Sequence, residues 1–305
     1  MKEAMTENKE RLARVQMLCK KYKMGSFKTI DYQVEFKDPP TPHYNILYID
    51  SKHNISYCPI YKSGSTSWIY NLCLLNGITE EELLSGKEQI SVIARRVMPE
   101  LDYPEADEFL KKTMKLLIVR HPFERLLSAY RDKLENSVAG REHGTLYFNR
   151  KYNQAIVRKY RDKSHPLPTV GEQVIRRSGQ PGPAGTEATW REFVDYIIAT
   201  DLASYADDHW MPYYLYCTPC LIKYDFIAKV ETLERDQTYV IHRMGLTDKI
   251  RPLWKHKISN TDAAKVYFKQ LTKEHVRKLH EKFKLDLELF GYSSERYYDF
   301  ATSST

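Results

Sequence analysis

Two short apolar runs, each leading directly into an amphipathic helix, constrain this fold most. The run ISYCPIY, residues 55–61, is followed from Trp68 by apolar residues at helical spacing. The second run, residues 115–119, is followed by Pro122, which suits the first turn of a helix, and by an apolar pattern that continues to Leu134. Two strand-to-helix units separated by a crossover predict an α/β fold, a parallel sheet flanked by helices.

Weaker patterns complete the predicted organisation. Residues 44–50 and 221–230 have the composition of strands, and helices are predicted at 9–22, 190–198, up to Gly245 and over 272–291. Residues 1–40 are interpreted as an N-terminal basic stem and helix segment, and residues 41–305 as a single catalytic domain. Residues 164–189 are rich in proline and glycine, which predicts a long loop that could act as a substrate-facing lid.

Charge and hydropathy narrow the class of partner. The 305 residues carry a formal net charge of +7, which favours an acidic partner such as nucleic acid, a membrane surface or an anionic polymer. Because no run of lysines concentrates this charge, a nucleic-acid partner is not predicted. The sequence contains no membrane-spanning run, and residues 1–25 contain no signal-peptide core. These two features are typical of a cytosolic protein, but the sequence of a luminal domain without its membrane anchor would have the same features.

The five cysteines limit the options for disulfides and metal. An odd number cannot all pair, so a disulfide scaffold is not predicted. Cys217 and Cys220 form a lone C-x-x-C motif, and a zinc site would need a second pair of ligands at matching spacing. We therefore predict no metal site, and either a local Cys217–Cys220 disulfide or two buried thiols.

The segment YKSGSTSW, residues 61–68, has the residue types of a phosphate-binding loop. At a strand-to-helix turn the backbone N–H groups and the helix dipole both favour an anion. Gly64 allows close approach of the backbone, the hydroxyl residues that follow it can donate hydrogen bonds, and Lys62 supplies a full positive charge. The lysine precedes the glycine, so the Walker spacing is not met. The alternative is a serine-rich turn with an exposed lysine.

The second strand-to-helix turn has a similar character. Arg120 ends the strand and Ser128 follows eight residues later, about two helical turns along. A phosphate at this helix start could bind the guanidinium of Arg120 and the hydroxyl of Ser128. Arg125 is a further candidate, although an arginine on a helix is more often a solvated charge. Two phosphate sites on neighbouring strands suit a nucleotide that is phosphorylated at two positions.

YKSGSTSW and VRHPFERLLSAYRDKL resemble the 5′-phosphosulfate and 3′-phosphate motifs of sulfotransferases that use 3′-phosphoadenosine 5′-phosphosulfate (PAPS). Together with DDHWMPYYLYCTPCLIKYDFIAKVETLERD and FKLDLELFGYS they resemble the Golgi carbohydrate sulfotransferases, the group of the chondroitin and dermatan 4-O-sulfotransferases and the HNK-1 sulfotransferase. The resemblance extends over residues 55–293.

The resemblance implies a P-loop-like α/β fold, PAPS as sulfate donor, no metal, and a type II membrane anchor before a luminal domain. The 3′ phosphate would be bound by Arg120 and Ser128. Many relatives have Asp where this chain has His121. We predict a structural role for His121. The residues implied for the 5′ phosphosulfate are Lys62, Ser63, Gly64, Ser65, Thr66, Ser67 and Trp68.

Sulfuryl transfer needs charge stabilisation on the leaving phosphate and a base for the acceptor hydroxyl. Lys62 is predicted to provide the former. For the base we favour His209, because histidine titrates near operating pH and two carboxylates precede this one. Asp207 and Asp208 are otherwise expected to be surface or helix-start charges. The alternatives for the base are His121 and acidic residues between the two motifs, Glu100, Asp102 and Glu105.

The predicted reaction is sulfation of a glycosaminoglycan, at O-4 of N-acetylgalactosamine in chondroitin or dermatan, in the Golgi lumen. The sequon Asn54-Ile55-Ser56 fits a luminal glycoprotein. Two alternatives are a cytosolic sulfotransferase for small phenols or steroids and a non-catalytic protein that binds anionic glycans. The first should have a glycine-rich cofactor-binding stretch near the C-terminus, which is absent after Gly245. The second is disfavoured by the intact Lys62, Gly64, Arg120 and Ser128.

Overall fold

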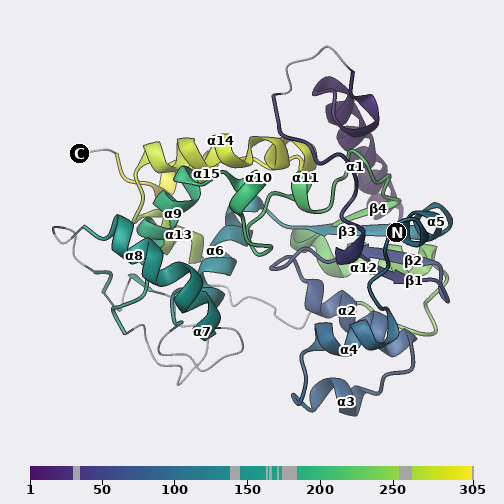
Figure 1. Ribbon diagram of the computed structural model, residues 1–305. Helices are drawn as coiled ribbons and strands as arrows, with labels where there is room; N and C mark the ends of the chain where they lie inside the picture. Colours follow the sequence, from purple (N-terminus) through teal and green to yellow (C-terminus); the bar gives the residue numbers. More distant parts are fainter. Residues whose placement is uncertain are drawn as a thin grey trace. The chain divides into compact units, whose positions relative to one another are not determined.

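The computed structural model describes residues 1–29, 35–137, 145–162, 164, 167–169, 172–173, 184–253 and 263–303. The chain divides into two compact units (Figure 1). The first consists of Met1–Arg120, Met211–Lys257 and Glu288–Gly291, and the second of His121–Trp210, Ile258–Leu287 and Tyr292–Thr305.

A four-stranded sheet organises the first unit. Its strands are β1 (Tyr48–Asp50), β2 (Ile55–Cys58), β3 (Met114–Val119) and β4 (Phe226–Lys229), in that spatial order. Strands β2, β3 and β4 are parallel, which confirms the predicted α/β sheet. Strand β1 pairs antiparallel with β2, because the connection over residues 51–54 is long enough for a hairpin but not for a crossover.

Apolar residues on both faces of the sheet bury it between helices. Tyr57 and Leu116 on one face, and Cys58 and Leu117 on the other, are fully buried, as expected for parallel strands covered on two sides. Helices α2 and α4 pack side by side (Figure 1). The helices of this unit are α1 (Lys2–Lys21), α2 (Ser65–Leu75), α3 (Glu80–Leu84), α4 (Ile90–Val97), α5 (Glu105–Lys112), α11 (Tyr213–Tyr216) and α12 (Leu233–Arg243).

Helix α1 covers the edge of strand β4. The side-chain amide of Asn8 donates to the carbonyl of Asp225 at 3.0 Å and accepts from the N–H of Ile227 at 2.9 Å. Arg11 donates to the Ile227 carbonyl at 2.9 Å. Because β4 is the last strand of the sheet, these side chains satisfy backbone groups that an edge strand otherwise exposes. The helix predicted at 9–22 therefore begins earlier, at Lys2, and packs on the sheet.

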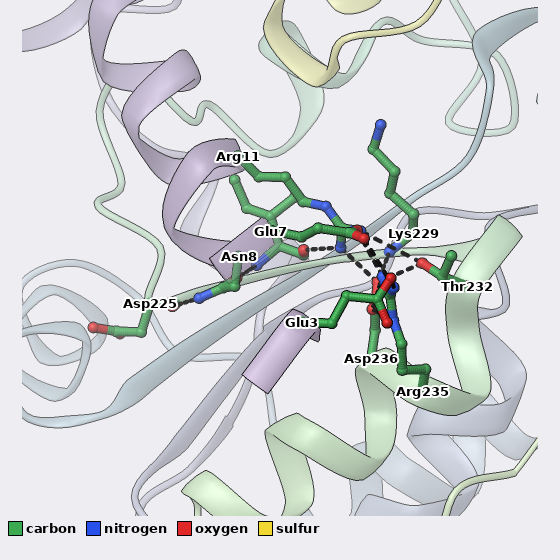
Figure 2. A network of polar contacts seen from close by, with 10 residues as sticks. Glu3, Glu7, Asn8, Arg11, Asp225, Lys229, Thr232, Arg235 and Asp236 are labelled. Atoms are coloured by element: carbon green, nitrogen blue, oxygen red, sulfur yellow. Dashed lines mark hydrogen bonds and ion pairs between the residues drawn. The ribbon is translucent and has the colours of Figure 1, made fainter. Parts of the chain in front are cut away.

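An ion-pair network joins α1 to α12 beside this edge (Figure 2). Arg235 forms a fork with both oxygens of Glu7, at 2.8 and 2.6 Å. Asp236 accepts from the guanidinium of Arg11, from the hydroxyl of Thr232 and from the N–H of Lys229. The hydrogen bond from Arg235 lowers the pKa of Glu7 in spite of partial burial.

Two long-range disulfides connect distant parts of the first unit. Cys19 pairs with Cys220 over a sequence separation of 201, and Cys58 pairs with Cys217 over 159. The predicted Cys217–Cys220 disulfide and the alternative of two buried thiols are therefore both wrong. Spacing along the chain suggested a local pair, whereas the tertiary fold presents each cysteine with a different partner. Cys73 is a free, buried thiol.

Gly25 allows the chain to pass close to one of these disulfides. It has φ of +57°, and a Cβ at this position would lie 1.9 Å from the carbonyl oxygen of Cys220. Any other residue would displace the backbone that carries the Cys19–Cys220 bond.

The second unit is built from helices around an aromatic core. Fully buried members of this core include Trp190, Phe193, Trp210 and Phe268. The described helices are α6 (Pro122–Lys133), α7 (Thr145–Phe148), the π-helical turn Asn149–Asn153, α8 (Gln154–Tyr160), α9 (Trp190–Ala199), α10 (Leu202–Tyr205), α13 (Ala263–Phe268), α14 (Lys273–Phe290) and α15 (Glu295–Phe300). The end of α14, from Glu288, belongs to the first unit.

The predicted lid over 164–189 lies largely outside the described residues. Within the described ranges, none of the helices combines the length and apolar character that a membrane crossing requires.

Candidate functional site

The loop between β2 and α2 turns sharply. Lys62 and Gly64 both adopt left-handed backbone conformations, with φ of 67° and 77°. The N–H of Ser63 closes the turn on the carbonyl of Ile60 at 3.2 Å, and α2 begins at Ser65. A left-handed lysine is uncommon and is typical of sites where function maintains strain. At Gly64 a Cβ would lie 3.3 Å from Cδ2 of Leu233, so glycine suits both the conformation and the close packing.

The same loop has the features that a phosphate requires. Ser63 is fully buried, and its hydroxyl has no hydrogen-bond partner in the described part of the chain. A buried hydroxyl without a partner is costly, and a ligand oxygen would satisfy it. Helix α2 has Gly64 as its N-cap, no side-chain cap and no acidic residue in its first turn. Its first N–H groups and its dipole favour an anion at this end.

Arg120 adds a buried cation to this loop. It directly follows β3, is 8% exposed and donates from Nη1 to the carbonyl of Lys62 at 3.3 Å. Its own carbonyl accepts from the hydroxyl of Tyr213 at 2.7 Å. Parallel strands β2 and β3 end at the same edge of the sheet, where ligands of open α/β sheets bind. Arg120 and the Lys62 loop, predicted separately, thus lie together.

Lys229 is a further cation at this edge that the sequence did not suggest. It ends β4 and is aligned with Val119, the residue before Arg120. Figure 2 shows its side chain leading away from the carboxylate of Asp236, which the Lys229 N–H contacts. Burial, and then the charge of Arg11, lower its pKa. The sequence feature that could have indicated Lys229 is its position, as a charged residue at the end of a predicted strand.

Helix α6, in the second unit, carries the other predicted donor residues. Arg125 is 2% exposed, and its Nη2 donates to the carbonyl of Asp208 at 2.7 Å. The expectation of a solvated arginine is therefore wrong, and Arg125 supports the segment that holds His209. Ser128 is half-buried on the same helix. The contact of Arg125 and Ser128 with the donor nucleotide stays a prediction.

His121 has structural contacts. Its Nδ1 accepts from the N–H of Phe123 at 3.1 Å and so caps α6, and its Nε2 lies 2.8 Å from the carbonyl of Ser293. The ring also packs against Tyr292 and Tyr297. These contacts agree with the predicted structural role and leave His121 a weak candidate for the base.

His209 is oriented by a carboxylate, and the carboxylate by a tyrosine. Nδ1 of His209 lies 2.7 Å from Oδ1 of Asp207, and the Tyr152 hydroxyl donates to Oδ2 of Asp207 at 3.0 Å. The side chain of Asp207 is 12% exposed, so the expectation of a surface charge is wrong. Burial opposes ionisation of Asp207, but the hydrogen bonds and charge of His209 outweigh it and lower the pKa. An Asp–His pair of this kind fixes the tautomer that a general base requires.

The acidic alternatives for the base have a different environment. Glu100, Asp102 and Glu105 are all exposed. Among the described candidates, His209 therefore has the geometry that best supports the role.

Comparison with known proteins identifies the family of this chain. The family model described as "Sulfotransferase family" matches residues 45–293. The chain belongs to the sulfotransferase family. It is 30% identical over 264 residues to carbohydrate sulfotransferase 11 of Rattus norvegicus, covering 82% of this chain and 68% of that protein. It is 30% identical over 255 residues to carbohydrate sulfotransferase 10 of Xenopus laevis, covering 81% and 67%. No solved structure matches.

Family membership makes the chain a PAPS-dependent sulfotransferase of the carbohydrate class. The aligned region spans between about half and two thirds of the relatives' own lengths; for carbohydrate sulfotransferase 9 of Homo sapiens it is 53%. Within the described residues, no group of three or more His, Cys, Asp or Glu side chains is arranged to hold a metal ion.

Proposed function

We propose that this sulfotransferase transfers sulfate to O-4 of N-acetylgalactosamine in a chondroitin or dermatan chain. The observation that supports binding of the sulfate donor is the buried hydroxyl of Ser63, which has no hydrogen-bond partner among the described residues, in a loop that also holds Lys62 and contacts Arg120. Anionic oxygens would complete the hydrogen bonding of this loop. The acceptor rests on the chain's net charge of +7 and on its similarity to carbohydrate sulfotransferases.

The roles of the residues follow from their chemistry. PAPS, when bound, supplies an activated sulfuryl group on a phosphate leaving group. Lys62 neutralises the charge that develops on that phosphate, and Ser63 and the first N–H groups of α2 hold its oxygens. His209, oriented by Asp207, removes the proton of the acceptor hydroxyl. Arg120, Arg125 and Ser128 are assigned to the 3′ phosphate.

We place the enzyme in the Golgi lumen, attached through an N-terminal membrane anchor outside this sequence. Two disulfides of long sequence separation support an oxidising compartment. Asn54 of the sequon is exposed in the turn between β1 and β2, where a glycan can be accommodated.

The test is transfer of labelled sulfate from PAPS onto desulfated chondroitin, dermatan and heparosan, followed by disaccharide analysis. We expect 4-O-sulfated N-acetylgalactosamine from chondroitin or dermatan and little product from heparosan. Sulfation at another position would refute the acceptor assignment but not the chemistry. Activity on small phenols or steroids alone would favour the small-molecule alternative. PAP binding without transfer to any acceptor would favour a non-catalytic protein.

A further inference from the structure

A cavity of about 550 Å³ opens within the second unit. It is formed by the π-helical turn and α8 on one side, and by α9 and α10 on the other. Its size falls within the range of about 300–1,000 Å³ typical of small-ligand sites. A π-helical turn is rare and is often found at functional sites; here it carries Lys151 and Tyr152 into the lining.

Four tyrosines give the cavity amphipathic walls. Tyr152 is buried, Tyr160 and Tyr196 are half-buried, and Tyr205 is 73% exposed. A tyrosine ring combines an apolar face with a hydroxyl, and a sugar has the complementary pattern of C–H faces and hydroxyl edges. The exposed ring of Tyr205, at the edge of this concave site, is accessible to a ligand.

The charged groups in the lining have one sign. Lys151 and Lys159 line the cavity, and none of its described lining residues is acidic. The Nζ atoms lie over aromatic rings, that of Lys151 at 5.0 Å from the Tyr152 centroid and that of Lys159 at 5.1 Å from the Tyr160 centroid. Asp201, at the start of α10, caps that helix through the N–H of Ala203 and is not part of the lining. The cavity therefore favours an anionic ligand.

Tyr152 connects this cavity to the proposed base. Its ring lines the cavity, and its hydroxyl donates a hydrogen bond to Asp207, which is in turn hydrogen-bonded to His209. A ligand in the cavity is thus separated from the Asp207–His209 pair by one side chain of the same unit.

We propose that this cavity is an acceptor subsite that binds a hexuronate residue of the glycan, with the tyrosine rings against its C–H face and Lys151 and Lys159 on its carboxylate. This inference rests on the proposed function, since it assigns the sugar that lies beside the sulfated one. Chondroitin and dermatan alternate N-acetylgalactosamine with a uronate, so one uronate always adjoins the sugar that is sulfated.

The experiment compares desulfated chondroitin with the same polymer after its carboxylates have been reduced to alcohols. Wild-type and variant proteins are assayed for kcat/KM, and for binding of octasaccharides of both kinds in the presence of PAP. In the wild-type protein we expect about tenfold preference for the native polymer. Lys159→Gln should lower kcat/KM on native chondroitin by about three- to fivefold, the effect of one partly exposed ion pair, and leave the reduced polymer unaffected. Tyr205→Ala should weaken the binding of both acceptors.

Arg158→Gln is the matched control, because Arg158 is an exposed cation beside Lys159 on α8 and does not line the cavity. Arg158→Gln should leave kcat/KM for both acceptors unchanged, and PAP affinity should be the same in all variants. If the wild-type protein transfers sulfate but Lys159→Gln retains its full preference for native chondroitin, the subsite is refuted and the proposed function survives. Lysine-dependent octasaccharide binding without any transfer refutes the proposed function and keeps the subsite. Neither binding nor transfer refutes both.

Discussion

At the scale of single residues, the candidate site is marked by polar groups whose surroundings are unusual. Ser63 has a buried hydroxyl without a partner in the described residues, and Lys62 has a left-handed backbone. The pKa of the half-buried Asp207 is lowered, because the hydrogen bonds and charge of His209 outweigh the effect of burial. The arrangements of Ser63 and Lys62 cost free energy in the folded protein unless a ligand or a reaction makes use of them.

Replacing His209 by alanine tests its role as the base. We expect turnover to fall by about 10²–10⁴-fold, the usual contribution of a general base, with PAP affinity unchanged. Steady-state kinetics and calorimetric PAP titration provide the two measurements. Near-normal turnover would remove His209 from the mechanism and return Glu100, Asp102 and Glu105 to consideration.

Asp207→Asn is the companion variant, since it keeps the shape of the side chain but removes the charge that orients the His209 ring. It should lower turnover in the same direction. The pKa of Asp207 is lowered from its ordinary 3.8, so its contribution to folding is present above that pH and is lost as the pH falls through the folded-state value. In this variant the free energy of unfolding, measured by denaturant titration at a series of pH values, should therefore fall less steeply as the pH is lowered.

At the scale of secondary structure elements, α1 covers the edge of the sheet at β4. Strand β4 is an edge strand, and an uncovered edge exposes backbone groups that can pair with other chains. Asn8 satisfies one carbonyl and one N–H of this edge, and Arg11 a second carbonyl. The ion pairs between Glu7 and Arg235 hold the helix over it.

Asn8→Ala should therefore destabilise the first unit by about 2–3 kcal/mol, because it removes the side-chain partner of the buried N–H of Ile227 in β4 and of the carbonyl of Asp225 just before the strand. Thermal unfolding followed by circular dichroism measures this effect. Glu10→Ala is the control on the same helix; Glu10 is exposed, and its replacement should stay within about 0.5 kcal/mol of the wild type. Equal melting temperatures for the two variants would show that the hydrogen bonds of Asn8 contribute little to the stability of the sheet edge.

At the scale of the whole molecule, two disulfides join segments that are far apart along the chain. A crosslink that closes a long loop restricts the unfolded state, and removing one typically costs about 2–5 kcal/mol. The two bonds differ in position. Cys58 ends β2, directly before the loop that holds Lys62, whereas Cys19 lies near the end of α1.

The Cys19→Ser/Cys220→Ser pair and the Cys58→Ser/Cys217→Ser pair should consequently behave differently. Both should lower the melting temperature, but only loss of Cys58–Cys217 should also weaken PAP binding, since it frees the strand end that positions the Lys62 loop. Calorimetry with PAP on the two double variants distinguishes these effects. Equal loss of PAP affinity in both would mean that the disulfides act through global stability alone.

Much of the fold could be predicted from periodicity. The strand at 115–119 and the helix at 272–291 correspond closely to β3 and α14, because a buried strand and a long amphipathic helix have strong local patterns. The antiparallel pairing of the predicted strand β1 and the disulfide pairing could not be predicted. Both depend on which segments meet in space, and spacing along the chain does not determine that.

The sequence by itself determined the α/β class, the phosphate-loop character of residues 61–68 and membership of the sulfotransferase family, since these depend on local order and residue type. Only the tertiary structure decided that Arg120 contacts the Lys62 loop, that Tyr152 donates a hydrogen bond to Asp207 and that four tyrosines and two lysines share one cavity. Those contacts join residues that are distant along the chain, and packing alone brings them together.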